Sequence, residues 1–109
     1  SISDANREYI SEKTRVIAAL IPEIDEKINA VSNGWPVTRL GKAELAIMRL
    51  AVYEIEYDND IPVNVAINEA VELAKKYGAD NAPSFINGVL AKLVNENEQD
   101  VEESKSEEE

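Results

Sequence analysis

Residues 42–57 decide the fold, and they read KAELAIMRLAVYEIEY. Written as an α-helix, this stretch has apolar side chains on most of its circumference, from Leu45 through Ile55. A helix that is apolar nearly all round needs neighbours on most of its sides. We therefore expect a central helix, wrapped by the other helices of a compact all-α bundle.

The flanking sequence predicts four more helices, which makes five in total. Proline lacks an amide hydrogen and disfavours a helical residue before it, so Pro22 is expected to end one helix and begin another. Gly78 is placed where a glycine commonly ends a helix, and Pro83 suits the first turn of the next one. No strand-like alternation of apolar and polar residues occurs. The five helices are expected over 4–20, 22–31, 42–57, 63–77 and 83–95.

Length and charge define the domain organisation. A chain of 109 residues supports one domain with a modest core. The formal net charge is −11, and residues 96–109 alone hold eight acids and one lysine. An acidic segment without apolar periodicity cannot bury enough surface to fold. We expect a helical domain over 1–95 and a disordered acidic tail over 96–109.

The composition excludes several classes of function. Cys and His are both absent, which excludes disulfides, zinc sites of the usual Cys/His kind and imidazole acid–base catalysis. The four glycines form no phosphate-binding loop, and the many carboxylates read as a solvated helical surface. No apolar run approaches the ~20 residues of a membrane span. We expect a protein that is not an enzyme and that has no cofactor or metal.

Arg49 and Gly88 are two residues that break their local pattern. Arg49 occurs on the most apolar helix, where an unpaired guanidinium would be strongly destabilising. We expect a structural ion pair with a neighbouring helix and name Glu69 as the partner. Gly88 lies inside the last predicted helix, where glycine costs ~1 kcal/mol relative to alanine, and we interpret it as a point of close helix–helix approach.

Two neighbours of Gly88 have open interpretations. Asn87 could pack within the protein or present its amide to a partner. Phe85 is the only phenylalanine, and its spacing from Val89 suits a core residue. Its place at a helix start, across a short turn from Lys75 and Lys76, also suits a stacking surface for a base.

Three stretches in order resemble the NusB family of transcription antitermination factors. The first is Trp35, Arg39 and Leu40 followed by AIMRLAVYE at 46–54, the second is IP at 61–62 with VAINEAVELAKKYG at 65–78, and the third is FINGVL at 85–90. The resemblance is clear over 35–93, extends to 4–34 and is absent from the acidic tail.

This resemblance implies a non-catalytic, cytoplasmic protein of all-helical fold. Family members bind the boxA element of nascent RNA, pair with the ribosomal protein NusE and join elongating RNA polymerase to suppress termination. Carried over position by position, Glu44 faces NusE, although an acid at a helix start is also favoured by the helix dipole. The residues expected at the RNA surface are Lys76, Tyr77, Asn81, Phe85 and Asn87.

One departure from the family changes the expectation for RNA. The family's arginine-rich N-terminal helix has no counterpart in this sequence, so we expect the domain to be incomplete at its N-terminus. Fewer phosphate contacts and a net charge of −11 predict that RNA binding is weak or not measurable. Missing helices would also leave an exposed apolar groove through which the protein could self-associate.

Two alternative functions belong to other classes. Ribosomal RNA cytosine methyltransferases carry a NusB-like helical domain ahead of a catalytic domain, and this chain could be such an accessory domain. A helical interaction module that binds no RNA is the second alternative. The Ser/Glu-rich tail looks like a natural C-terminus without a following catalytic domain, which favours the antitermination factor.

Overall fold

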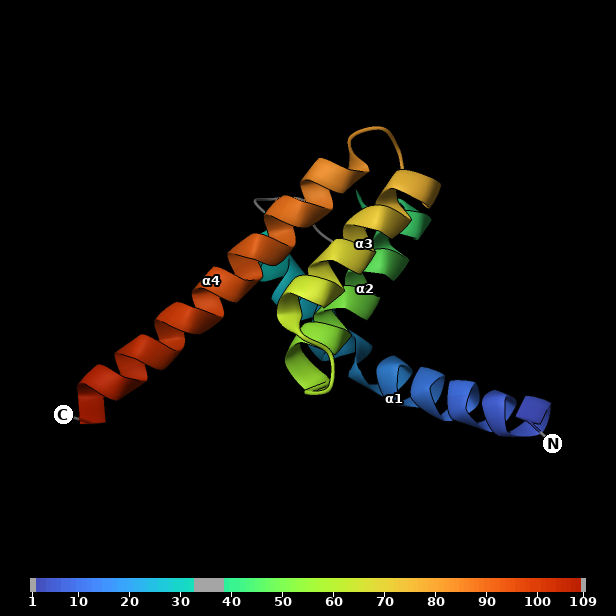
Figure 1. The fold of residues 1–109 in the computed structure, drawn as a ribbon. Helices are drawn as coiled ribbons and strands as arrows, with labels where there is room; N and C mark the ends of the chain where they lie inside the picture. The colour runs from blue at the N-terminus through green and yellow to red at the C-terminus, as the bar shows by residue number, and fades with distance from the viewer. Residues whose placement is uncertain (1, 33–38, 109) are drawn as a thin grey trace.

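The computed structural model describes residues 2–32 and 39–108, and the side chains of residues 7, 8, 11–32 and 39–98 within them. The described residues form four helices: α1 (Ile2–Val31), α2 (Lys42–Tyr57), α3 (Val63–Tyr77) and α4 (Ala82–Glu108). Figure 1 shows α2 and α3 side by side at the centre, with the N-terminal half of α1 and the C-terminal half of α4 projecting from the bundle. The connector that carries Trp35 lies outside the described residues. The all-α prediction is confirmed.

The expected break at Pro22 is wrong, because α1 runs through this proline without interruption. Proline removes one backbone hydrogen bond, whereas the turns that follow it bury Ile24, Ile28 and Val31 almost completely. Burial of these side chains against the core stabilises the helix beyond the proline. Four helices are therefore observed in place of the five expected.

The central position of α2 is confirmed by its contacts with α1, α3 and α4. Met48 and Val52 are buried at its inner face, together with Ile47 and Ala51. The facing stripe of α3 consists of three buried alanines, Ala66, Ala70 and Ala74. Such small side chains let helices approach closely, and the larger Ile86 and Leu90 of α4 fill the remaining space in the core.

The backbone of the acidic segment continues α4, which is helical through Glu108. Residues 96–108 contain no glycine or proline and are rich in glutamate, which has a good helix propensity. Where the extension begins, the Asn97 Nδ2 donates to Glu56 Oε1 of α2 over 2.6 Å. Disorder of the acidic tail over residues 96–109 stays a prediction.

The ion pair of Arg49 joins α2 to α1. Its Nε and Nη2 donate to the two carboxylate oxygens of Asp25 over 2.9 and 2.8 Å, which is a bidentate arrangement. The two side chains are only 29% and 19% exposed. This hydrogen bonding raises the pKa of the Arg49 guanidinium, so the guanidinium stays charged.

The expected partner Glu69 is therefore wrong. Glu69 lies on α3, close enough to Glu54 of α2 for their charges to interact. Burial raises the pKa of the Glu54 carboxyl, and the negative charge of Glu69 adds to that effect. The helical spacing indicated that Arg49 needs a partner but not which neighbouring helix supplies it.

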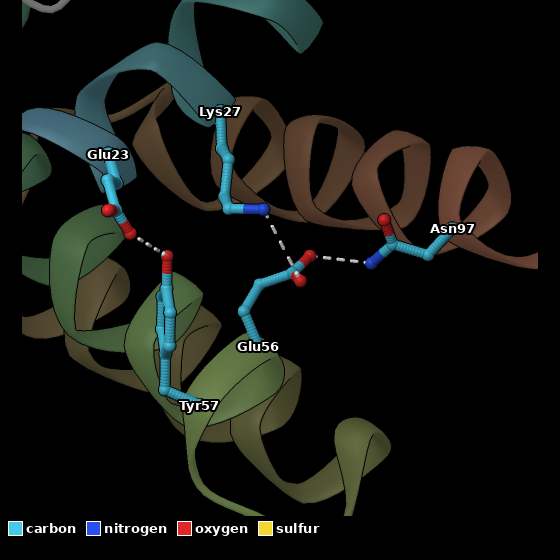
Figure 2. A network of polar contacts seen from close by, with 5 residues as sticks. All are labelled: Glu23, Lys27, Glu56, Tyr57 and Asn97. Carbon is cyan, nitrogen blue, oxygen red and sulfur yellow. Dashed lines mark hydrogen bonds and ion pairs between the residues drawn. The ribbon is translucent and has the colours of Figure 1, made fainter. Parts of the chain in front are cut away.

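A second set of polar contacts fastens the C-terminal end of α2 to both long helices. Figure 2 shows Glu56 between Lys27 of α1 and Asn97 of α4, with the Lys27 Nζ 3.7 Å from Glu56 Oε2. Beside them, the Tyr57 hydroxyl donates to Glu23 over 3.1 Å. Burial and this contact with a carboxylate raise the pKa of Tyr57. These contacts fix where α1 and α4 cross the end of α2.

The glycines at 78 and 88 have opposite surroundings. A Cβ at Gly88 would meet no described atom within 4 Å, so the expected close helix–helix approach at this residue is wrong. A Cβ at Gly78 would lie 2.7 Å from the Ala82 Cβ and 2.9 Å from the Ala74 carbonyl oxygen. Gly78 has a φ of −94°, so space, and not a left-handed conformation, requires glycine there.

The ion-pair assignment predicts which acid matters for stability. Asp25→Ala should lower the free energy of unfolding by about 1–3 kcal/mol, because Arg49 would lose its partner while remaining half-buried. Glu69→Ala and the neighbouring exposed Glu26→Ala should each change it by less than about 0.5 kcal/mol. Urea unfolding monitored by circular dichroism measures all three. A larger loss for Glu69→Ala than for Asp25→Ala would contradict the assignment.

The surroundings of the two glycines predict that replacing each by alanine changes the stability of the protein in opposite directions. Gly88→Ala should stabilise the protein by about 0.5–1 kcal/mol, because alanine has the higher helix propensity and meets open space. Gly78→Ala should destabilise it by about 1–3 kcal/mol through overpacking against backbone. Thermal unfolding of the two variants checks the signs, and destabilisation by Gly88→Ala would restore the packing interpretation.

Candidate nucleic-acid and protein interface

The residues expected at the RNA surface fall in one continuous segment, residues 76–87. Lys76 and Tyr77 end α3, Asn81 lies in the turn, and Phe85 and Asn87 lie in the first turns of α4. Figure 1 shows this turn at the tip of the bundle, where α3 passes into α4. All five residues therefore belong to one end of the helical pair, which we call the α3–α4 tip (residues 76–87).

The aromatic side chains of the α3–α4 tip differ in exposure. Tyr77 is 63% exposed, and the Lys76 Nζ lies 5.8 Å from the centroid of its ring. Phe85 is half-buried, with part of its ring packed against the core. The structure thus combines the two interpretations of Phe85: it contributes to the core and keeps some surface exposed. Lys76, Asn81 and Asn87 are exposed.

The α3–α4 tip is less acidic than the chain as a whole. It contains one lysine, Lys76, and one acid, Asp80, in a chain whose net charge is −11. The neighbouring Lys75 forms an exposed ion pair with Glu72 over 3.0 Å. An exposed lysine beside an exposed aromatic ring can bind a phosphate group and stack a base.

A hollow of ≈ 780 Å³ lies along α3 next to this surface. The residues that line it are Asn68, Glu69, Glu72, Leu73, Lys75 and Lys76. Large hydrophobic side chains are exposed at Val16 on α1 and at Val63 and Val65 on α3. Self-association through an apolar groove stays a prediction.

Glu44 has a structural role that the sequence did not reveal. Its Oε1 accepts a hydrogen bond from the backbone N–H of Ala79 over 2.9 Å, which ties the first turn of α2 to the turn between α3 and α4. This bond, and secondarily its own backbone N–H, lower the pKa of the Glu44 carboxyl. The two residues are 35 positions apart, so no local sequence pattern could have paired them.

Metal-binding clusters and membrane-spanning helices are absent from the part of the chain that is described. No three Asp or Glu side chains there are grouped so that they could hold a metal ion. No described helix is long and apolar enough to cross a membrane. The chemistry available at the α3–α4 tip is hydrogen bonding, charge attraction and stacking.

The tie between Glu44 and Ala79 predicts a pH-dependent contribution to stability. At pH 7, Glu44→Gln should lower the free energy of unfolding by about 0.5–1 kcal/mol, because a neutral amide accepts a weaker hydrogen bond and lacks the favourable interaction with the helix dipole. The folded-state pKa of Glu44 is lowered from 4.5, so its contribution is present above that pH and lost as the pH falls through the lowered value. Urea unfolding at a series of pH values from 7 downward should show a difference between the two proteins that shrinks as the pH falls below 4.5. An equal difference at every pH value would contradict this role of the carboxylate.

Comparison with known proteins shows the family of the chain. The NusB family pattern matches residues 1–95. Two curated relatives, both named transcription antitermination protein NusB, come from Agathobacter rectalis (56% identity over 92 residues) and Lachnoclostridium phytofermentans (49% over 94 residues). The matches cover 84% and 86% of this chain and 70% and 71% of those relatives.

A solved structure gives the same result in three dimensions. The chain is similar to T. maritima NusB with a TM-score of 0.72 and 38% sequence identity. The similarity covers 75% of this chain and 58% of that one, so the chain spans little more than half of the solved protein. Sequence and fold agree over the described helices. This chain belongs to the NusB family.

Proposed function

We propose that this chain acts in transcription antitermination by binding boxA-type RNA through the α3–α4 tip. The observation that carries the proposal is the exposed Lys76–Tyr77 pair, which places a cation beside an exposed aromatic ring in an otherwise acidic protein. Its relatives bear the name transcription antitermination protein, which supports the same cellular process. The protein partners that we propose are NusE and the elongating RNA polymerase.

Each residue type at the tip has a role that suits single-stranded RNA. Lys76 attracts phosphate, and Tyr77 and the exposed part of Phe85 offer rings on which bases can stack. The side-chain amides of Asn81 and Asn87 are exposed and can pair with base edges through a donor and an acceptor. Unpaired bases are accessible to all of these groups, whereas those of a duplex are not.

The negative net charge of the protein keeps its affinity for RNA low. Few lysines near the tip can replace counterions on the phosphates, and the net charge of −11 repels RNA at long range. We propose weak binding that is strongest at low ionic strength. The protein partner adds contacts of its own, and Glu44, half-buried beside the tip, is the residue that we propose for NusE.

Phe85→Leu tests the stacking role while keeping an apolar side chain in the partly buried position. The affinity for a boxA-type RNA oligonucleotide at low salt should fall roughly 5- to 100-fold, because stacking of one base on an aromatic ring contributes about 1–3 kcal/mol. Fluorescence anisotropy of labelled RNA measures the affinity, and circular dichroism confirms that the variant is folded. The control is Ser84→Ala, a neighbouring exposed position on α4 that should change the affinity little.

Four outcomes would overturn parts of this proposal. Submicromolar affinity of the unaltered chain would contradict the weak binding expected from its charge. Absence of RNA binding at any protein concentration would contradict the proposed function itself. Unchanged affinity in Phe85→Leu would remove Phe85 from the site, and unfolding of this variant would show that its role is in the core.

A further inference from the structure

Two glycines from distant parts of the chain surround the carboxylate of Glu44. A Cβ at Gly41, just before α2, would collide with Glu44 Oε2, and a Cβ at Gly78, just after α3, would lie 3.2 Å from Oε1. The Oε1 accepts the Ala79 N–H over 2.9 Å. The carboxylate therefore occupies a space that both backbone segments leave open, and it holds the start of α2 against the turn that follows α3.

We propose that Glu44 is a positioning residue for RNA binding, which holds the turn of residues 78–81 in the geometry that presents Tyr77, Asn81 and Phe85. This inference rests on the proposed function of the α3–α4 tip. It assigns Glu44 an effect on RNA that is present without any protein partner. A group that acts only by contacting NusE would have no such effect.

The expected effect of Glu44 on RNA binding follows from the hydrogen bonds that hold the turn of residues 78–81 in place. The turn of residues 78–81 joins the two helices, and the Gly78 N–H attaches it to α3 by donating to the Ala74 carbonyl oxygen over 2.9 Å. Two bonds attach it to α4: the Ala82 N–H donates to the Ala79 carbonyl oxygen over 2.9 Å, and the Phe85 N–H donates to the Asn81 carbonyl oxygen over 3.2 Å. The Glu44 bond attaches it to α2, and thereby fixes the start of α4 relative to the end of α3.

One consequence is that protein and RNA binding are linked. The residue that we propose for NusE also holds the RNA-facing turn, so a partner that contacts Glu44 acts on the turn as well. Linkage requires that RNA then alters the affinity for that partner by the same factor.

The direction in which RNA affinity changes distinguishes a positioning role of Glu44 from a purely electrostatic one. Removing one negative charge from an acidic protein weakens the repulsion of RNA and should raise the affinity slightly. Loss of the tie to Ala79 should lower it. Glu44→Ala removes both the charge and the tie, whereas Glu44→Gln removes the charge and keeps an oxygen that can accept the Ala79 N–H.

The experiment measures the affinity of the whole chain for a boxA-type RNA oligonucleotide at low salt and neutral pH, without a protein partner. Glu44→Ala should bind roughly 3- to 10-fold more weakly than the unaltered chain, and Glu44→Gln should bind at least as well as the unaltered chain. The matched control is Glu26→Ala, which removes an exposed acid of α1 and should raise the affinity slightly. Circular dichroism at the assay temperature establishes that each variant is folded.

A second variant tests the hydrogen bond from its other end. Ala79→Pro removes the donor N–H and leaves the Glu44 charge in place. If both residues act through one bond, the double variant Glu44→Ala/Ala79→Pro should bind no more weakly than the weaker single variant. The hydrogen-exchange rate of the Ala79 amide, measured by NMR, should rise in Glu44→Ala and stay low in Glu44→Gln.

The outcomes distinguish this inference from the proposed function. RNA binding by the unaltered chain together with equal or tighter binding by Glu44→Ala overturns the positioning role and leaves the RNA site standing. Equal losses in Glu44→Ala and Glu44→Gln also overturn it, because glutamine keeps an oxygen that can accept the Ala79 N–H. Failure of the unaltered chain to bind RNA overturns the proposed function, and the positioning role with it.

Discussion

Burial of the inner face of α2 is the interaction on which the rest of the structure depends. Met48 and Val52 of α2 are almost fully buried, α2 contacts α1, α3 and α4, and buried side chains from all four helices form one core cluster. Burying one such side chain contributes about 1.5–3 kcal/mol. Because α3 and α4 both pack on α2, their packing also fixes where the turn between them lies. The position of the α3–α4 tip is therefore set by packing in the core.

The polar contacts adjust this arrangement at both ends of α2. At its start, Glu44 holds the turn that carries the proposed RNA surface. At its other end, Glu56 accepts from Asn97 and pairs with Lys27, so that α1 and α4 leave the bundle in fixed directions. Between these ends, Arg49 and Asp25 join α2 to α1 by a bidentate ion pair. In a protein with net charge −11, such pairing keeps acidic residues from repelling one another near the core.

Much of the fold could be predicted because helical periodicity and end signals are local. The bounds of α3 and the central place of α2 followed from apolar spacing, glycine and proline. The break predicted at Pro22 was wrong because burial of the following turns outweighs one lost hydrogen bond. The Glu69 partner was wrong because the sequence shows that a guanidinium needs an acid, but not how helices rotate against each other. The Glu44 tie depends on that same rotation, so it became visible only in three dimensions.

The central claim is that this NusB-family bundle presents residues 76–87 to RNA. Amide chemical shifts of the isotope-labelled chain, recorded while a boxA-type RNA oligonucleotide is added at low salt, test it most directly. The account predicts concentration-dependent shifts that cluster in residues 76–87, with the amides of residues 11–30 in α1 unaffected. Shifts that cluster on α1, or that spread evenly over all four helices, would contradict it.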